Sequence, residues 1–171
     1  NNKTKVVVHG KNNKEYLRNL KYKNSNIYIR YNEAIPILDK ITKNKSLMSH
    51  VSSRKPFGLP TDFYKTNKFK HRKENKNDIQ CIAKAMELGF INNDNQNAFI
   101  GKPNQVCTES YMVIGADLNL DEYKCNNLVT YLKTKFARFC HGVAKSSQDA
   151  TAKTYCYVPL PDLSKVWTDR E

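Results

Sequence analysis

The chain has 171 residues, enough for one domain with a substantial core or for two small lobes that share one. Its 29 Lys and Arg exceed its 16 Asp and Glu, which gives a formal net charge of +13 and a pI near 9.5. This balance favours a polyanionic partner such as nucleic acid. No apolar run approaches the length of a membrane span, which predicts no membrane partner. Five widely separated cysteines without metal-ligand spacing predict reduced thiols in a cytoplasmic protein.

The positive charge is distributed unevenly along the chain. Residues 1–76 contain 19 Lys and Arg against 5 acids, whereas residues 77–171 contain 10 against 11. We therefore expect a single domain over residues 1–171, with a basic N-terminal lobe (1–76) and a C-terminal lobe (77–171) as its subdivision. The alternative is that Lys, like the abundant Asn, is used wherever a polar residue is tolerated.

The predicted elements of the N-terminal half are short. The run of valines at Lys5–His9 predicts a strand, and alternating apolar residues predict a second strand at 26–31. Residues 33–43 have a helical pattern in which Pro36 must occupy the first turn. The prolines and glycine of SRKPFGLPTD (53–62) predict a stiff loop. The polar, cationic residues 66–78 predict an exposed arm.

The C-terminal half is expected to supply the sheet and the main helix. Strands are predicted at residues 79–83, 111–115 and 154–158. Between the last two, apolar residues at helical spacing predict one helix over residues 120–145, with cations and hydroxyl or imidazole groups on its opposite face. The fold class is therefore α+β, with a small mixed or antiparallel sheet, one long amphipathic helix and several shorter helices.

Four segments together resemble a known family. They are SSRKPFGLPTDF (52–63), CTESYMVIGADL (107–118), CNNLVTYLKTKFARF (125–139) and YVPLPDLSKVWTD (157–169). In order and spacing they resemble the C-terminal target-recognition region of adenine-specific DNA methyltransferases from type II restriction–modification systems, some of which are fused to an endonuclease. The resemblance covers roughly the last two-thirds of the chain.

The resemblance implies a sequence-specific partner of double-stranded DNA within a larger enzyme. The catalytic methyltransferase or nuclease domain, in the same chain or a partner chain, would flip the adenine and hold S-adenosylmethionine, with magnesium where cleavage occurs. This chain has no Pro-Pro pair and no glycine-rich nucleotide loop, so we expect no catalytic residue, metal or cofactor within it. Its two ends suggest a piece excised from a larger protein.

The loop at residues 52–63 is the first candidate for contact with bases. Arg54 could contact guanine through two hydrogen bonds, Lys55 a phosphate, and Ser53 or Thr61 either one. Phe57 could wedge between bases or stack on one. Alternatively, the apolar residues anchor a surface loop and the cations are merely solvated.

Further contacts are expected from the helix, from the polar residues after it and from the basic arm. Arm cations would follow phosphates and add affinity that falls with salt. A solvated helix face and an ordinary polar loop are the alternatives. The candidates are Thr134, Lys135, Arg138 and Lys145 on the helix, Gln148 and Lys153 after it, and Lys68, Lys70, Arg72 and Lys73 in the arm.

Other chemistry is weakly supported. Asp121 and Glu122 resemble part of a nuclease metal site, but acids at a predicted helix start favour interaction with the helix dipole instead. The five cysteines lack metal-ligand spacing, which predicts reduced and mostly buried thiols. An RNA-binding module and a non-catalytic protein-interaction domain remain the alternatives to DNA recognition.

Overall fold

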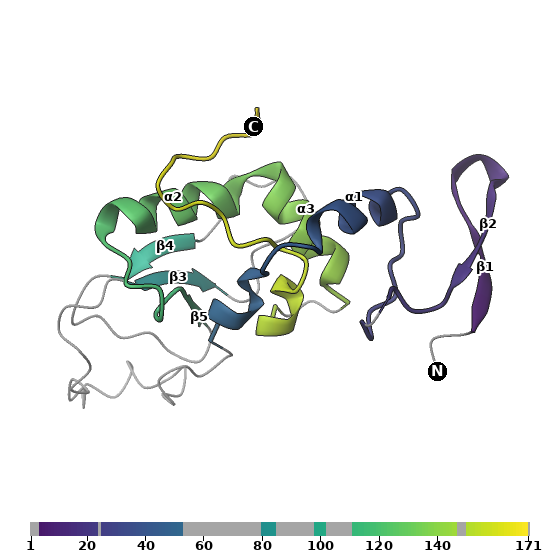
Figure 1. The fold of residues 1–171 in the computed structure, drawn as a ribbon, viewed down its shortest axis with the longest axis horizontal. Coiled ribbons are helices and arrows are strands. Elements are labelled where there is room, and N and C mark those ends of the chain that lie inside the picture. The colour runs from purple at the N-terminus through teal and green to yellow at the C-terminus, as the bar shows by residue number, and fades with distance from the viewer. Residues whose placement is uncertain are drawn as a thin grey trace. The chain divides into compact units, whose positions relative to one another are not determined.

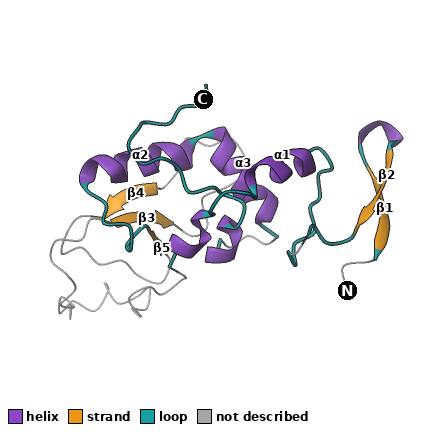
Figure 2. Ribbon diagram, in the orientation of Figure 1, coloured by secondary structure: helices purple, strands orange, loops and turns teal. Residues whose placement is uncertain are grey.

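The computed structural model describes residues 4–23, 25–52, 80–84, 98–101, 111–146 and 150–170, with the backbone alone for 80–84, 101 and 111. The chain divides into two compact units, Asn1–Lys43 and Asn44–Glu171. Both contain helix and strand, which confirms the α+β class (Figures 1 and 2). The division between units falls at residue 43, whereas the change in charge along the sequence falls near residue 76.

The first unit begins with an antiparallel hairpin. Strand β1 (Lys5–His9), predicted from its valines, pairs with β2 (Glu15–Asn19), with Val7 opposite Leu17. Strand β2 was missed, because EYLRN mixes charged and apolar residues and shows its alternation only once it is paired. Valine is favoured in such strands because its branched side chain packs well on a pleated surface.

Residues 26–31 do not form the predicted strand. The Arg18 guanidinium donates a hydrogen bond to the Ile29 carbonyl and lies over the Tyr28 ring, with its central carbon 4.8 Å from the ring centroid. Ser25 accepts from the Ile27 amide at 3.2 Å. Side chains therefore occupy backbone groups that a neighbouring strand would otherwise pair, and the segment stays irregular although Ile29 is fully buried.

Helix α1 (Ala34–Ile41) closes the first unit close to where the sequence predicts it. Pro36 is its third residue, so its missing N–H lies in the first turn, where no helical partner exists. Beside the helix, the Asp39 carboxylate accepts from Tyr22 Oη at 2.6 Å and lies 2.7 Å from Lys23 Nζ. The Lys23 and Tyr22 hydrogen bonds lower the pKa of Asp39.

The second unit contains a three-stranded antiparallel sheet in the order β4–β3–β5. Strands β3 (Gln80–Lys84) and β5 (Tyr111–Ile114) confirm the expected strands at 79–83 and 111–115. The short β4 (Ala98–Gly101) was not predicted. Met112, Val113 and Ile114 are all buried. Helix α2 packs against β3 and β4, and Val51 bridges to Ile114 at the edge of β5.

The predicted helix over residues 120–145 is two helices, α2 (Glu122–Lys133) and α3 (Lys135–Ala144). Thr134 between them has φ −63° and ψ 149°, an extended conformation that ends one helix and starts the next. Its Oγ1 accepts from the Ala137 amide at 3.2 Å and donates to the Tyr131 carbonyl at 2.7 Å. The prediction of helix over this range is confirmed, but the prediction of one unbroken helix was wrong.

The break at Thr134 changes which residues of α3 are buried. The buried face is Ala137, Cys140, His141 and Ala144, at the i, i+3, i+4, i+7 spacing of one helix face, with Val143 beside it. The apolar spacing that predicts a single helix would place Phe136 on its buried side, but Phe136 is 41% exposed.

Within the described ranges, no helix combines the length and the apolar character needed to cross a membrane.

Two 3-10 helices, η2 (Leu47–His50) and η4 (Ala152–Tyr155), pack together in the second unit. Residues 154–158 are therefore not the predicted strand. Thr151 and Thr154 cap each other's backbone N–H in a capping box, which starts a helical turn where the apolar alternation suggested an extended chain.

Substitution of Thr134 tests the break between α2 and α3. Thr134→Ala removes the cap of α3, and we expect the free energy of unfolding to fall by about 1 kcal/mol. Thr134→Ser keeps the hydroxyl and should remain close to the unsubstituted protein. Urea unfolding followed by the fluorescence of Trp167, the one tryptophan of the chain, measures both. Equal stability of the two variants would show that the hydroxyl is not what stabilises the break.

Candidate nucleic-acid interface

Most of the predicted base-contacting and phosphate-contacting residues lie outside the described residues. They are Ser53, Arg54, Lys55, Phe57 and Thr61 in the loop, Lys68, Lys70, Arg72 and Lys73 in the arm, and Gln148. The structure thus describes the scaffold from which these segments leave, together with the predicted cations of α3 and η4.

Residues 50–52, just before the proline-containing segment, are hydrogen-bonded to the sheet. The Ser52 amide donates to the Val113 carbonyl at 2.8 Å, and the Gly115 amide donates to the His50 carbonyl at 2.7 Å. With the bridge between Val51 and Ile114, these bonds attach the chain to the edge of β5. Ser52, the last described residue before the proline-containing segment, is therefore bonded to a buried sheet.

The predicted cations of α3 and η4 differ in exposure. Lys135 and Lys153 are exposed, whereas Arg138 and Lys145 are half-buried. Lys135 Nζ lies 3.9 Å from Asp169 Oδ2, and its side chain is 83% exposed. An exposed ion pair of this length contributes little stability, so a phosphate group could compete with Asp169 for this ammonium.

Thr134 and His141 do not belong to the exposed cationic face that the sequence predicted. Thr134 is 5% exposed and its hydroxyl serves as the cap of α3, so its prediction as a DNA contact is corrected. His141 is 3% exposed, and its Nε2 lies 2.8 Å from Thr154 Oγ1. Since that hydroxyl donates to the Thr151 carbonyl, His141 Nε2 must be the donor in this pair.

The N-terminus of α3 is occupied by a carboxylate of the chain itself. The Lys135 amide donates to Asp169 Oδ1 at 2.5 Å, in addition to the longer contact of its ammonium with the same carboxylate. Amide donors at a helix N-terminus attract anions. Asp169 therefore takes a position that a phosphate would otherwise favour.

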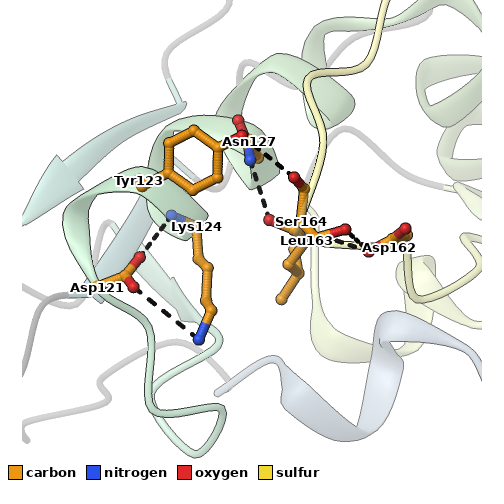
Figure 3. Close-up of polar contacts among 7 residues, drawn as sticks. All are labelled: Asp121, Tyr123, Lys124, Asn127, Asp162, Leu163 and Ser164. Atoms are coloured by element: carbon orange, nitrogen blue, oxygen red, sulfur yellow. Dashed lines mark hydrogen bonds and ion pairs between the residues drawn. The ribbon is translucent and has the colours of Figure 1, made fainter.

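Residues 157–169, here named the closing segment, run along α2 and are held by its side chains (Figure 3). Tyr123 Oη donates to the Ser164 carbonyl at 3.1 Å and Asn127 Nδ2 to the Leu163 carbonyl at 2.9 Å. One turn further, Tyr131 Oη donates to the Pro159 carbonyl at 2.9 Å. These three bonds hold the closing segment along α2.

The closing segment is also braced internally. Asp162 Oδ1 accepts from the amide and the hydroxyl of Ser164 at 2.9 and 2.7 Å, and these bonds lower the pKa of Asp162 (Figure 3). Trp167 Nε1 donates to the Asp162 carbonyl at 2.8 Å, and its ring meets the Tyr131 ring edge-on with centroids 5.4 Å apart. The indole thereby connects the closing segment to α2.

The acidic residues that suggested a nuclease metal site have structural roles. Asp121 caps α2, accepting from the Lys124 amide at 2.7 Å, and Glu122 is the first residue of that helix (Figure 3). Asp117 lies 2.8 Å from His50 Nδ1. Among the residues that the structure describes, no three His, Cys, Asp or Glu side chains gather to hold a metal ion.

Comparison with protein-family models, with curated proteins and with solved structures found no match. The resemblance to target-recognition regions is therefore carried by its four sequence segments. The described parts of three of them, in β5, α2 with α3, and the closing segment, lie together in the second unit. The fourth begins at Ser52, which is bonded to β5.

Sequence reasoning missed a second set of exposed cations, in the β1–β2 hairpin. Lys5, Lys11 and Lys14 are exposed there, but none was singled out as a candidate. The available signal was the GKNNK run after the valines. Two asparagines between lysines are typical of a hairpin turn, although the residues after them, EYLRN, do not alternate regularly between polar and apolar.

Two adjacent asparagines on α2 offer a matched test of the closing segment. Asn127 is 1% exposed, so Asn127→Ala leaves the Leu163 carbonyl without its donor and should lower the free energy of unfolding by about 1–3 kcal/mol. Trp167 emission should then shift to longer wavelength as water reaches the indole.

Asn126→Ala is the control, because Asn126 is exposed and its amide bonds only the Glu122 carbonyl within its own helix. Alanine is the better helix former, so this variant should be as stable as the unsubstituted protein. Equal effects of the two substitutions would contradict the role given to Asn127.

The described cysteines are buried thiols rather than nucleophiles. Cys125 and Cys140 are fully buried and Cys156 is half-buried, all as free thiols. Burial raises the pKa of Cys140 to about 12 and that of Cys156 to about 11. A thiol reacts as its thiolate, which is scarce when the pKa lies far above the pH of the solution.

We expect iodoacetamide at pH 8 to leave Cys140 of the folded chain unmodified while it alkylates the same residue in urea. Both the raised pKa and the absence of exposed surface at Cys140 slow the reaction. Mass spectrometry of the Cys140 peptide at successive times measures the rate. Rapid labelling of the folded chain would mean that α3 opens or that the thiol is activated.

Proposed function

We propose that the chain is a double-stranded-DNA-binding target-recognition domain of a type II restriction–modification enzyme. The parent activity would be adenine methylation, endonucleolytic cleavage or both. The proposal rests on the resemblance of four segments to such domains and on the charge of the chain. This chain would provide recognition, while a catalytic domain in the same or a partner chain would carry out the reaction.

The concentration of positive charge is the observation that carries the proposal. Residues 1–43 alone hold 10 Lys and Arg against 3 acids, and residues 1–76 hold 19 against 5. Neutralising phosphates with such cations releases condensed counterions, which is the main source of affinity for DNA. Solubility alone does not require that the charge be concentrated in one part of the chain.

The proposed division of labour follows from the side chains involved. Arg54 with Lys55, Phe57 and the hydroxyls of Ser53 and Thr61 would read base edges from the loop that leaves β5. Lys135, Lys153 and the arm cations would contact phosphates and fix the position of the domain. Arg138, Lys145 and Gln148 remain secondary candidates in this proposal, and Thr134 is withdrawn from it.

S-adenosylmethionine, and magnesium where cleavage occurs, would be bound by the catalytic domain rather than by this chain. We propose a cytoplasmic location, where DNA is accessible in the cells that use restriction–modification systems. The free thiols Cys125, Cys140 and Cys156 agree with a reducing compartment. Extrusion of the target adenine would be the task of the catalytic domain.

The salt dependence of binding tests the proposal. A fluorescein-labelled 24-base-pair duplex should bind the chain with an affinity that falls linearly on a log–log plot against salt, with a slope of about −0.9 per phosphate contacted. Competition with duplex RNA and with single strands separates DNA recognition from an RNA-binding module. Binding that is indifferent to ionic strength, or absent, would contradict the proposal and favour a protein-interaction domain.

Two double variants separate base reading from phosphate contact. Selection from a random duplex pool should enrich a shared sequence with the unsubstituted chain. Arg54→Ala with Lys55→Ala should reduce or relax that preference, since base contacts specify the sequence. Lys135→Ala with Lys153→Ala should weaken binding to all duplexes alike and lower the salt slope by about two. An unchanged preference in the Arg54 and Lys55 variant would remove the loop from the proposed readout.

A further inference from the structure

The β1–β2 hairpin has one face that is half-buried and one that is exposed. Val6, Val8, Tyr16 and Arg18 point to the side that packs within the first unit, and Val8 is 8% exposed. On the other side, Val7 and Leu17 lie opposite each other and are 52% and 68% exposed. Within the described residues, nothing covers this pair of apolar side chains.

Polar side chains flank the exposed apolar pair. Lys5 pairs across the strands with Asn19, and His9 pairs with Glu15, whose carboxylate lies 3.5 Å from His9 Nδ1. The face therefore presents an ammonium and an amide at one end and an imidazole with a carboxylate at the other. This combination of donors, acceptors and two aliphatic groups matches the chemistry of base edges.

The tip of the hairpin is basic and has a fixed conformation. Strands β1 and β2 are joined by a short 3-10 turn, η1 (Lys11–Asn13). Within it and next to it, Asn12 and Asn13 have φ of 59° and 55°, a left-handed conformation that Asn tolerates. The Gly10 amide donates to the Lys14 carbonyl at 2.7 Å, which closes the strands below the turn. Lys11 and Lys14 flank the two asparagines, and all four side chains are exposed.

We propose that the β1–β2 hairpin enters the major groove of duplex DNA as a two-stranded ribbon. This inference rests on the proposed function and assigns a DNA contact to a part of the chain for which the resemblance implies none. Lys11 and Lys14 contact phosphates at the rim of the groove, and the exposed face carrying Val7 and Leu17 turns toward the base edges.

The dimensions and charge of the hairpin fit this partner. Two paired strands lie about 4.8 Å apart, and the major groove of B-form DNA, about 12 Å wide, admits such a ribbon with its side chains. The exposed face and the tip carry three lysines, Lys5, Lys11 and Lys14, and one acid, Glu15, which can accept from the amino group of cytosine. Valine and leucine side chains can contact the thymine methyl group.

The same fit excludes two other occupants. A-form duplex RNA has a deep and narrow major groove that a ribbon cannot enter. A second copy of this chain would bring the same excess of positive charge against itself, although the apolar pair alone would suit it. Duplex DNA is the occupant that satisfies both the apolar pair and the charge around it.

Substitution of the tip lysines tests the inference in the full chain. Lys11→Ala with Lys14→Ala should weaken binding to a fluorescein-labelled 24-base-pair duplex and lower the slope of log affinity against log salt by about two. In the part of the chain that the structure describes, neither side chain makes a hydrogen bond or ion pair, so the hairpin should stay folded.

The matched control is Lys40→Ala with Lys43→Ala, which removes the same charge from the same unit at the end of α1. This variant should change the slope far less than the tip variant. Equal losses from the two variants would mean that the charge acts diffusely and would overturn the ribbon, while the proposed function would stand. Failure of the unsubstituted chain to bind the duplex would instead overturn the proposed function.

A second variant tests the exposed face without altering charge. Val7→Thr with Leu17→Thr keeps strand-favouring side chains but replaces apolar surface by hydroxyls. We expect weaker binding to B-form DNA, unchanged binding to duplex RNA and an unchanged molecular mass in analytical ultracentrifugation. A dimer that dissociates in this variant, or an equal loss of RNA binding, would overturn the inference.

Discussion

Hydrogen bonds from α2 to the backbone of the closing segment are the interaction on which the rest of the second unit depends. Tyr123, Asn127 and Tyr131 are four residues apart and so lie on one face of the helix. They donate to the carbonyls of Ser164, Leu163 and Pro159, which places the segment antiparallel to α2. Prolines at 159 and 161 lack the N–H that a regular ladder requires. The segment forms an isolated bridge from Pro159 to Ser46, and side chains of α2 pair three more of its carbonyls.

The closing segment also fixes the start of α3. Asp169 near its end accepts from the Lys135 amide, immediately after the break at Thr134. The start of α3 is thereby connected to the closing segment as well as to α2. In this position the helix buries Ala137, Cys140, His141 and Ala144. What remains for a partner on this helix is the long side chain of Lys135 and the half-buried Arg138 and Lys145.

A common physical theme links the proposed contacts with DNA. In both units, hydrogen-bonded backbone lies next to the proposed contact. In the second unit the chain at Ser52 is bonded to β5, and in the first unit the bond between Gly10 and Lys14 closes the tip of the hairpin. Contacts built on fixed backbone lose less entropy on binding than contacts built on free chain. Cations near these points can therefore add selectivity as well as charge attraction.

The sequence by itself determined what depends on local pattern: β1, α1, β3, β5 and the Asp121 cap. The tertiary structure decided the remainder. The start of α3 after Thr134 is held by Asp169, 34 residues further along the chain. The Ile29 carbonyl is taken by Arg18, from a strand 11 residues earlier. The exposure of Phe136 and the burial of His141 followed, because a break in one helix changes the phase of every residue after it.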